Sequence, residues 1–493
     1  MKKSIFLLVF MLFVHFSYAQ WATVGSPIDG AAANDKASWS LSLSGDGQKM
    51  AIGAPYNDAS GVDAGHVRVY EQVNGNWQQL GADINGAAAG DLSGRAVSLS
   101  QDGLRLAIGA SNHSSNRGQV RIFEWNGTSW QQMGLDIDGE NGADFFGKSV
   151  SLSHDGSILA ASATGNDDAG TDAGHVRIFE WNGTSWQQKG SDVDGEGSNA
   201  YTGNSVSISA DGLRFAVGAT GNDGNGIDAG HVRIFEWNGT DWQQMGSDID
   251  GEAAGDELGW WVSLSGNGNR LAAGGTYNDG NGTDAGHARI FEWNGTSWQQ
   301  MGADIDGEAA SDFSGRSVSL NYDGSRVAVG STGNDANGTD AGDVRVFEWN
   351  GTSWQQFGPA ILGEFAGDFV GHSVALDSAG QTLAISATGN DNNGNEAGQT
   401  QVFQTSNAVA ITSIQKNTQV KIYPQPATSF INIEAEGLEA IYLYNHLGQL
   451  LKMQTLQSAT NVYQLELQNY PAAVYYITIL SKEGKYSQKV ILR

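Results

Sequence analysis

Short runs of alternating apolar and polar residues follow one another along most of the chain, separated by Gly, Asn and Asp. Alternation with a period of two residues predicts half-buried β-strands. Asp155-Gly156 and Asn182-Gly183 each separate two such runs, and both pairs tolerate the positive φ of a tight hairpin turn. The stretch around these turns therefore predicts four antiparallel strands, at 149–153, 158–162, 175–180 and 185–188.

This four-strand pattern recurs with a nearly fixed period. The tight-turn pairs begin at residues 46, 102, 155, 211, 267, 323 and 379, so the spacing is 56 residues except for one interval of 53. Four-strand units at such a period are typical of β-propeller blades. Trp-Gln-Gln marks the fourth strand of six units, at Trp77, Trp130, Trp186, Trp242, Trp298 and Trp354.

The seventh unit ends after its third strand, Gln399–Gln404, and the segment Trp21–Gly25 supplies the missing fourth strand. Closing the ring in this way removes free sheet edges. We therefore predict an all-β protein with a seven-bladed β-propeller over residues 20–404, in which the N-terminal strand closes the last blade.

One motif in each unit resembles a known repeat. Phe146-Gly147-Lys148-Ser149-Val150, the Asp-Gly turn that follows and the later Gly-His-Val-Arg-Ile-Phe strand resemble the FG-GAP repeat of integrin-type β-propellers. The resemblance covers about residues 20–404 and implies the propeller fold. The first unit departs from it, with Lys36-Ala37-Ser38 where the Phe-Gly pair should stand.

The period stops after Gln404, and residues 405–419 are predicted to be a linker. Residues 420–493 hold six basic and five acidic residues, and their alternating apolar runs predict a small β-sandwich. Tyr423-Pro424-Gln425-Pro426-Ala427, Tyr444–Gln449 and Ala473–Tyr476 resemble the C-terminal sorting domain of type IX secretion cargo in Bacteroidetes. The resemblance implies the type IX secretion machinery as a partner, with passage across the outer membrane and often surface attachment. The alternative is a generic β-sandwich that binds another ligand.

The first nineteen residues predict export. Lys2 and Lys3 precede the apolar run Ile5–Phe16, and Ser17-Tyr18-Ala19 supplies small residues for cleavage after Ala19. The run is too short for a membrane anchor, and no other stretch is long and apolar enough for a transmembrane segment. We expect a secreted or extracellular protein, attached or not to the outer-membrane surface.

Composition narrows the range of partners. The chain has no cysteine, which excludes disulfides, thiol nucleophiles and Cys-ligated metals. Its 26 basic and 54 acidic residues give a net charge of −28, which makes nucleic acids and anionic membranes poor partners. Of the 49 acidic residues before the tail, 35 fall in loops that propeller topology places on one face. A glycan or protein ligand is expected at this acidic face.

One loop type has metal-ligand character. The pattern Asn-Asp-x-x-Gly-x-Asp recurs in the loops between second and third strands, and oxygen-rich loops of this kind can hold Ca²⁺. The alternative is that these side chains cap their own turns. The candidate calcium ligands are Asp58, Asp63, Asp167, Asp172, Asp223, Asp228, Asp279, Asp284, Asp335 and Asp340.

One position just before each first strand varies freely, although its flanking residues are nearly copied. A propeller places this position near the mouth of its central channel, where indoles, cations and polar groups could form a ring around a ligand and Trp could stack on a sugar. The alternative is drift at an exposed position. The ring residues are Trp39, Arg95, Lys148, Asn204, Trp260, Arg316 and His372.

No catalytic motif is present in the sequence, and His66, His175, His231 and His287, one per unit, are expected to be polar residues at the start of their strands. We therefore expect a non-enzymatic binding or adhesion protein, for a glycan or another extracellular ligand. The alternatives are a polysaccharide-active propeller enzyme, sialidase-like or lyase-like, and a structural surface protein. The sequence does not identify the ligand or the oligomeric state.

Overall fold

The computed structural model describes residues 21–405, 420–424, 426–444, 450–471, 473–481 and 484–493. The chain divides into two compact units, Gln20–Thr405 and a second that contains Ser406–Arg493. The predicted signal peptide and residues 406–419 of the predicted linker lie outside the described residues, as does the segment 445–449 of one sorting motif.

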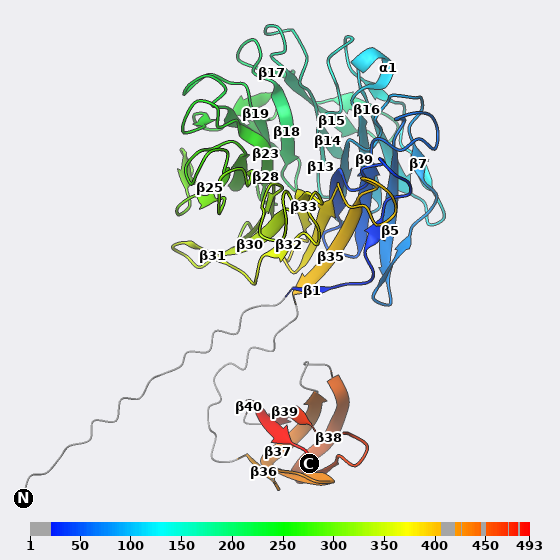
Figure 1. Cartoon of the computed structure of the whole chain (residues 1–493), viewed down its shortest axis with the longest axis vertical. Coiled ribbons are helices and arrows are strands. Elements are labelled where there is room, and N and C mark those ends of the chain that lie inside the picture. The colour runs from blue at the N-terminus through cyan, green and yellow to red at the C-terminus, as the bar shows by residue number, and fades with distance from the viewer. Residues whose placement is uncertain (1–20, 406–419, 425, 445–449, 472, 482–483) are drawn as a thin grey trace, which may run out of the picture. The chain divides into compact units, whose positions relative to one another are not determined.

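Seven antiparallel sheets form the first unit, numbered here from the first to the seventh along the chain. In six sheets four strands lie side by side in sequence order, and in the seventh β1 takes the fourth position; a two-residue fifth strand lies beside the third strand of each sheet (Figure 1). The innermost strands are β3 (Ser40–Leu43), β8 (Ala96–Leu99), β13 (Val150–Leu152), β18 (Thr202–Ile208), β23 (Leu258–Leu264), β28 (Ser314–Leu320) and β33 (Val370–Leu376). The second strands are β4 (Lys49–Ala54), β9 (Arg105–Ala110), β14 (Ile158–Ala163), β19 (Arg214–Ala219), β24 (Arg270–Gly275), β29 (Arg326–Ser331) and β34 (Thr382–Ala387).

The remaining strands complete the outer part of each sheet. The third strands are β5 (His66–Val73), β10 (Gln119–Trp125), β15 (His175–Trp181), β20 (His231–Trp237), β25 (His287–Trp293), β30 (Asp343–Trp349) and β35 (Gln399–Thr405). The fourth strands are β6 (Asn76–Gln79), β11 (Trp130–Gln132), β16 (Trp186–Gln188), β21 (Trp242–Gln244), β26 (Trp298–Gln300), β31 (Trp354–Gln356) and β1 (Trp21–Thr23). The fifth strands are β7 (Ile84–Asn85), β12 (Ile137–Asp138), β17 (Val193–Asp194), β22 (Ile249–Asp250), β27 (Ile305–Asp306), β32 (Ile361–Leu362) and β2 (Ile28–Asp29). The shortened loop of the second repeat forms α1 (His113–Asn116).

The N-terminal strand completes the seventh sheet, as the sequence predicts. β1 pairs with β35 in antiparallel register, with Trp21 opposite Thr405 and Thr23 opposite Phe403. The indole Nε1 of Trp21 also donates to the carbonyl of Phe357, 3.2 Å away in the sixth sheet. The two ends of this unit are therefore held in one sheet.

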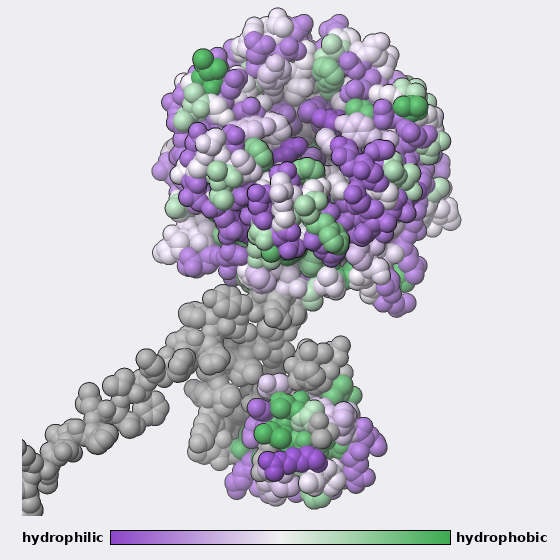
Figure 2. All heavy atoms as spheres, viewed as in Figure 1, coloured by the Kyte–Doolittle hydropathy of each residue, from purple (hydrophilic) through white to green (hydrophobic). Residues whose placement is uncertain are grey.

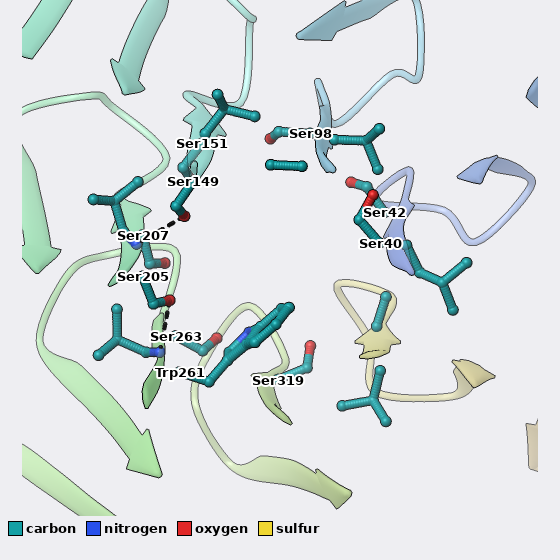
Figure 3. A pocket seen from close by; sticks show the side chains of 18 of the residues that line it. Ser40, Ser42, Ser98, Ser149, Ser151, Ser205, Ser207, Trp261, Ser263 and Ser319 are labelled. Atoms are coloured by element: carbon teal, nitrogen blue, oxygen red, sulfur yellow. Dashed lines mark hydrogen bonds between the residues drawn. The ribbon is translucent and has the colours of Figure 1, made fainter. Parts of the chain in front are cut away.

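Serine hydroxyls join the innermost strands of neighbouring sheets (Figure 3). The backbone N–H of Val262 donates to Ser205 Oγ at 3.0 Å, and that of Leu264 donates to Ser207 Oγ at 2.9 Å. Equivalent bonds link each sheet to the next, and Leu41 N–H to Ser373 Oγ links the first sheet to the seventh. The serines that alternate with apolar residues thus satisfy the free N–H groups of each inner edge.

A second set of bonds joins the sheets farther out. The indole of each fourth-strand tryptophan donates to a backbone carbonyl of the preceding sheet, as Trp186 does to Met133 at 3.1 Å. The other members are Trp77, Trp130, Trp242, Trp298 and Trp354, at 2.7 to 3.1 Å, together with Trp21. Buried side chains from adjacent sheets pack together between these two sets of bonds.

Five strands form the second unit: β36 (Lys421–Tyr423), β37 (Phe430–Tyr444), β38 (Leu450–Glu466), β39 (Val474–Ser481) and β40 (Gly484–Ile491). The sequence predicts a sandwich, whereas the hydrogen bonds of the described residues join all five strands into one sheet. The long strands β37 and β38 shift register near Leu438, and residues of all five strands share one core. The strand content is as predicted, and the sandwich stays a prediction.

Candidate ligand-binding site

All seven ring residues predicted from the sequence line one cavity of about 520 Å³. Each stands in or just before an innermost strand: Trp39 immediately precedes β3, and Asn204 lies within β18. In four sheets the strand register shifts beside this position, as between Thr202 and Ser205. Such bulges re-aim a side chain, here into the cavity that the innermost strands enclose. The cavity members are Trp39, Arg95, Lys148, Asn204, Trp260, Arg316 and His372.

Contacts run from side chain to side chain through five of the seven ring residues. The Arg95 guanidinium lies 5.2 Å from the ring centre of Trp39, whose indole centre is 4.5 Å from that of His372. Arg316 Nη2 is 3.0 Å from His372 Nε2, and its guanidinium lies 4.8 Å from the Trp260 ring centre. These contacts hold two indoles and two guanidinium groups in fixed positions around the channel.

The remaining two ring residues, Lys148 and Asn204, make fewer contacts. Asn204 Nδ2 donates to the backbone carbonyl of Trp260 at 2.9 Å. Lys148 stands between Arg95 and Asn204 in the order of the sheets, and among the described residues its ammonium has no hydrogen-bond or ion-pair partner. This cation is therefore available to a ligand.

The electrostatics of the cavity are positive, although the whole chain is acidic. Across the described part of the chain, Arg95, Lys148 and Arg316 form no ion pair with a carboxylate. Burial, followed by the two guanidinium groups, lowers the pKa of Lys148 to about 7, and burial lowers the pKa of Arg316 to about 10. Burial and then Arg316 hold the pKa of His372 well below its ordinary value. Three cations thus raise one another's free energy, which a bound anion would relieve.

A carboxyl group that the sequence reasoning missed lies beside this cavity. Glu257 lines a neighbouring pocket of about 590 Å³ together with Lys148, Asn204, Tyr201 and Asp228. Burial, with a smaller contribution from the Asp228 carboxylate, raises the pKa of Glu257 to about 7. Comparison of the repeats could have identified Glu257, because only the fifth copy carries a carboxyl group at this position. The equivalent residues in the other copies are Lys36, Leu92, Phe145, Tyr201, Phe313 and Phe369.

In the predicted calcium loops, one carboxylate oxygen of the first aspartate already accepts a backbone hydrogen bond from the same loop. Asp58 Oδ1 accepts the backbone N–H of Asp63 at 2.8 Å, and the second aspartate has a positive φ of 51°. The same bond recurs at 2.8 or 2.9 Å in the other four loops, from Asp172 to Asp167, Asp228 to Asp223, Asp284 to Asp279 and Asp340 to Asp335. The structure therefore shows the turn-capping role of the first aspartate, and calcium binding stays a prediction.

The visible surface of the first unit is largely polar. Figure 2 shows hydrophilic residues over most of the visible face of the first unit. In the part of the chain that the structure describes, no helix has the length and apolar character needed to cross a membrane.

Comparison with family models identifies the second unit. Residues 421–493 match the secretion system C-terminal sorting domain. The sequence resemblance to type IX cargo is thus confirmed for the tail. This domain indicates export through the type IX system, to the cell surface or beyond, and implies contact with that machinery.

Comparison with solved structures concerns the first unit. The chain is similar to the β-propeller domain of the trilobed protease from Pyrococcus furiosus, at 10% identity and a TM-score of 0.40, over 75% of this chain and 91% of that one. It is also similar to the Dos1 propeller, at 11% identity and a TM-score of 0.42, over 78% and 95%. A third similar structure is the GH74 xyloglucanase from Xanthomonas campestris, at 12% identity and a TM-score of 0.43, over 85% and 60%.

Two of these similar structures, the trilobed protease domain and Dos1, are described as β-propellers. Comparison with curated proteins found no match.

Proposed function

We propose that this protein is an exported, non-enzymatic binding or adhesion protein that captures an extracellular ligand at the mouth of its central channel. Its first unit is a closed seven-bladed propeller of FG-GAP-type repeats, and its tail directs export and surface attachment. One observation carries the proposal: the seven side chains that vary between otherwise similar repeats line a single cavity. Drift at exposed positions is disfavoured because none of the seven side chains is exposed: six are half-buried and His372 is buried.

The chemistry of the ring indicates a glycan with an acidic group. Trp39 and Trp260 offer apolar ring faces that can pack on sugar rings. Arg95, Lys148 and Arg316 can donate charge-assisted hydrogen bonds to a carboxylate, sulfate or phosphate. The acidic loops predicted around the mouth repel extended polyanions, so a ligand with one or a few acidic groups fits best. The proposal retains Ca²⁺ at the rim loops as a supporting ion.

A glycan array tests this proposal with the chain from Gln20 to Arg493, in buffers with calcium and with a chelator. The double variant Trp39→Ala/Trp260→Ala removes both indoles from the ring. The matched control is His154→Ala/Tyr322→Ala, which removes an aromatic pair from the pocket at the opposite ends of the innermost strands. We expect wild type and control to bind the same glycans and the indole variant to lose them. Binding that survives in the indole variant would place the site elsewhere, and no binding by wild type would contradict the glycan ligand.

Glu257 favours a second candidate function, a polysaccharide-active enzyme. A carboxyl group with a pKa of about 7 can both donate and accept a proton near neutral pH. It shares its pocket with Lys148 and Asn204 of the ring, so a ligand at the channel mouth would reach it. Release of a shortened or unsaturated glycan by wild type, abolished in Glu257→Gln, would favour this function. A structural surface protein would show neither binding nor conversion.

A further inference from the structure

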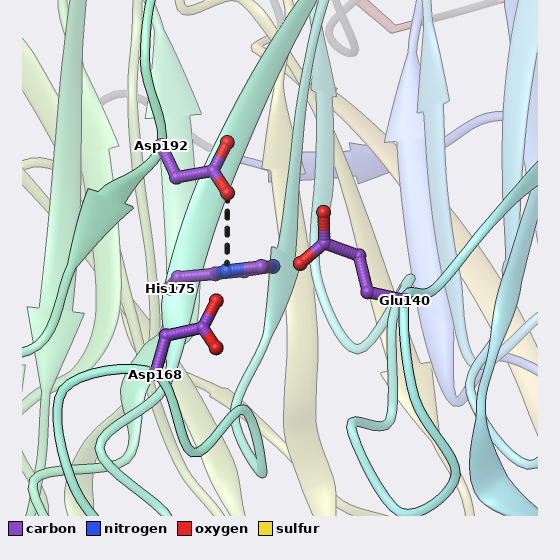
Figure 4. Close-up of side chains that lie close together, drawn as sticks. All are labelled: Glu140, Asp168, His175 and Asp192. Carbon is purple, nitrogen blue, oxygen red and sulfur yellow. Dashed lines mark ion pairs between the residues drawn. The ribbon is translucent and has the colours of Figure 1, made fainter.

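A second group of side chains, of the types that bind metal ions, recurs in several copies of the repeat. It lies at the start of the third strand, where one sheet packs against the next. In the third sheet His175 is the first residue of β15, and Asp192 directly precedes β17. Asp168 lies in the loop before β15, and Glu140 follows β12 of the second sheet. One ligand atom from each residue lies within 4.8 Å of all the others. Figure 4 shows the three carboxylates around the edges and faces of the imidazole ring.

His175 lacks the partners that a buried imidazole normally has. Its side chain is 0% exposed, and neither ring nitrogen makes a hydrogen bond in the structure. The nearest carboxylate oxygens to Nδ1 are those of Asp192 at 3.8 Å and Asp194 at 4.0 Å. Buried polar groups without partners are rare, because the lost hydration is not replaced. The carboxylates of Glu140 and Asp168 remain exposed, so that a solute can enter from solvent.

The seven repeats provide an internal comparison. Three residues occur together in the third, fourth and fifth copies only: a glutamate before the sheet, a histidine at the start of the third strand and an aspartate after the fourth strand. The fourth and fifth sets are Glu196, His231 and Asp248, and Glu252, His287 and Asp304, and both bring their ligand atoms within 4.8 Å. At the same three positions, the first, second, sixth and seventh copies have, in that order, Ala31, His66 and Asp83; Ala87, Gln119 and Asp136; Glu308, Asp343 and Ala360; and Glu364, Gln399 and Pro27.

Two of the incomplete copies satisfy their aspartate with protein groups. Arg68 binds both carboxylate oxygens of Asp83, at 3.0 and 2.9 Å. Gln119 Nε2 donates to Asp136 at 3.1 Å. In the third copy Asp192 accepts from Gln188 Nε2, as Asp83 and Asp136 do from their glutamines, but neither His175 nor Arg177 on the third strand makes a further bond to it. The third copy therefore leaves room for a further positively charged partner.

The net charge of the cluster in the third copy also favours a bound cation. The three carboxylates of the cluster and that of Asp194, 4.0 Å from His175 Nδ1, face one guanidinium group, that of Arg177, which lies 3.6 Å from Glu140. The balance is three negative charges, which a divalent cation would reduce to one. Arg177 is already bound to the backbone carbonyl of Asp138 at 2.8 Å, so it can orient Glu140 without occupying the centre of the cluster.

We propose that Glu140, Asp168, His175 and Asp192 bind a divalent transition-metal ion such as Zn²⁺. The sets around His231 and His287 are weaker sites of the same kind, because Gly224 and Gly280 stand where the third copy has Asp168. A mixed nitrogen and oxygen ligand set suits zinc, whereas calcium prefers oxygen ligands alone. Each ion would bind both the loop that follows one sheet and the third strand of the next sheet. It would therefore cross-link neighbouring sheets and stabilise the ring.

Zinc binding to the chain from Gln20 to Arg493 tests this proposal, measured by calorimetry at neutral pH with excess calcium to saturate oxygen-only sites. We expect three zinc ions per chain, one of them bound more tightly, and a higher Tm with zinc present. His175→Gln, which copies the natural Gln119, should remove the tight site and leave two. Asp168→Gly should reduce the tight site to the affinity of the other two. Cobalt can replace zinc in this experiment, and the visible absorption of bound cobalt shows whether a nitrogen atom is among its ligands.

His66→Gln is the matched control, because His66 occupies the same strand position in a copy without the glutamate. It should leave three zinc ions bound. The proposal is wrong if wild type binds no zinc under these conditions, or if His175→Gln and His66→Gln alter the stoichiometry equally. Tryptophan fluorescence and near-ultraviolet circular dichroism check that each variant keeps the native fold.

Discussion

At the scale of single residues, the channel mouth depends on charge that the protein does not neutralise. Burial and the guanidinium groups of Arg95 and Arg316 lower the pKa of Lys148, and its ammonium forms no ion pair among the described residues although Glu257 and Asp228 line the adjoining pocket. An ammonium in this position is costly unless an anion is present. The side chain therefore couples ligand binding to protonation.

Binding of an acidic glycan should weaken as the pH rises through about 7. Below this pKa Lys148 is protonated and can pair with the ligand, and above it the amine is neutral, while an unperturbed lysine would stay charged to much higher pH. We expect an affinity loss of about tenfold between pH 6 and pH 8.5, since a charge-assisted hydrogen bond contributes about 1.5 kcal/mol. Calorimetric titration across this range checks it. Lys148→Gln should bind weakly at every pH, and an unchanged pH profile in that variant would show that another group titrates.

The ring could be predicted from the sequence because seven copies of one unit show which position varies. Glu257 was open to the same comparison, since it replaces residues such as Phe313 and Phe369, but its raised pKa depends on burial that the sequence does not give. The histidine clusters were not predicted for a different reason. Glu140 follows the last strand of one sheet and His175 begins the third strand of the next, and only the packing of the two sheets brings them together.

At the scale of elements, the alternating serines of the innermost strands have a defined role. An inner strand has one side without a partner strand, and the hydroxyls of the preceding sheet bind its N–H groups. The sequence predicts the strands from the apolar positions alone. The serine bonds escape prediction because they depend on the offset between neighbouring sheets.

Ser205→Ala should destabilise the first unit by about 1 to 3 kcal/mol, because it leaves the buried N–H of Val262 without an acceptor. Chemical denaturation monitored by tryptophan fluorescence measures the change. Ser198→Ala is the control, since Ser198 is exposed on a loop and should have little effect on the free energy of unfolding. Equal effects of the two substitutions would show that the serine bonds between sheets add no stability.

At the scale of the whole molecule, the first unit combines a strongly acidic chain with a positive channel mouth. The net charge of −28 and the unpaired cations of the cavity act in opposite directions on an approaching anion. Pairing of β1 with β35 holds the first and last sheets together, and this was predictable from the missing fourth strand of the last repeat. The tail was predictable from its sorting motifs, whereas its joining into one sheet was not.

The most direct test of the account compares one glycan in two chemical forms. The best-bound acidic glycan from the array is titrated into the wild-type chain, and then the same glycan after its carboxylates have been reduced to alcohols. The account predicts that the acidic form binds and that the reduced form binds at least tenfold more weakly, as the loss of one charge-assisted pair implies. Equal affinity for both forms, or an acidic form bound equally well by Lys148→Gln and wild type, would contradict a cationic ligand site at the channel mouth.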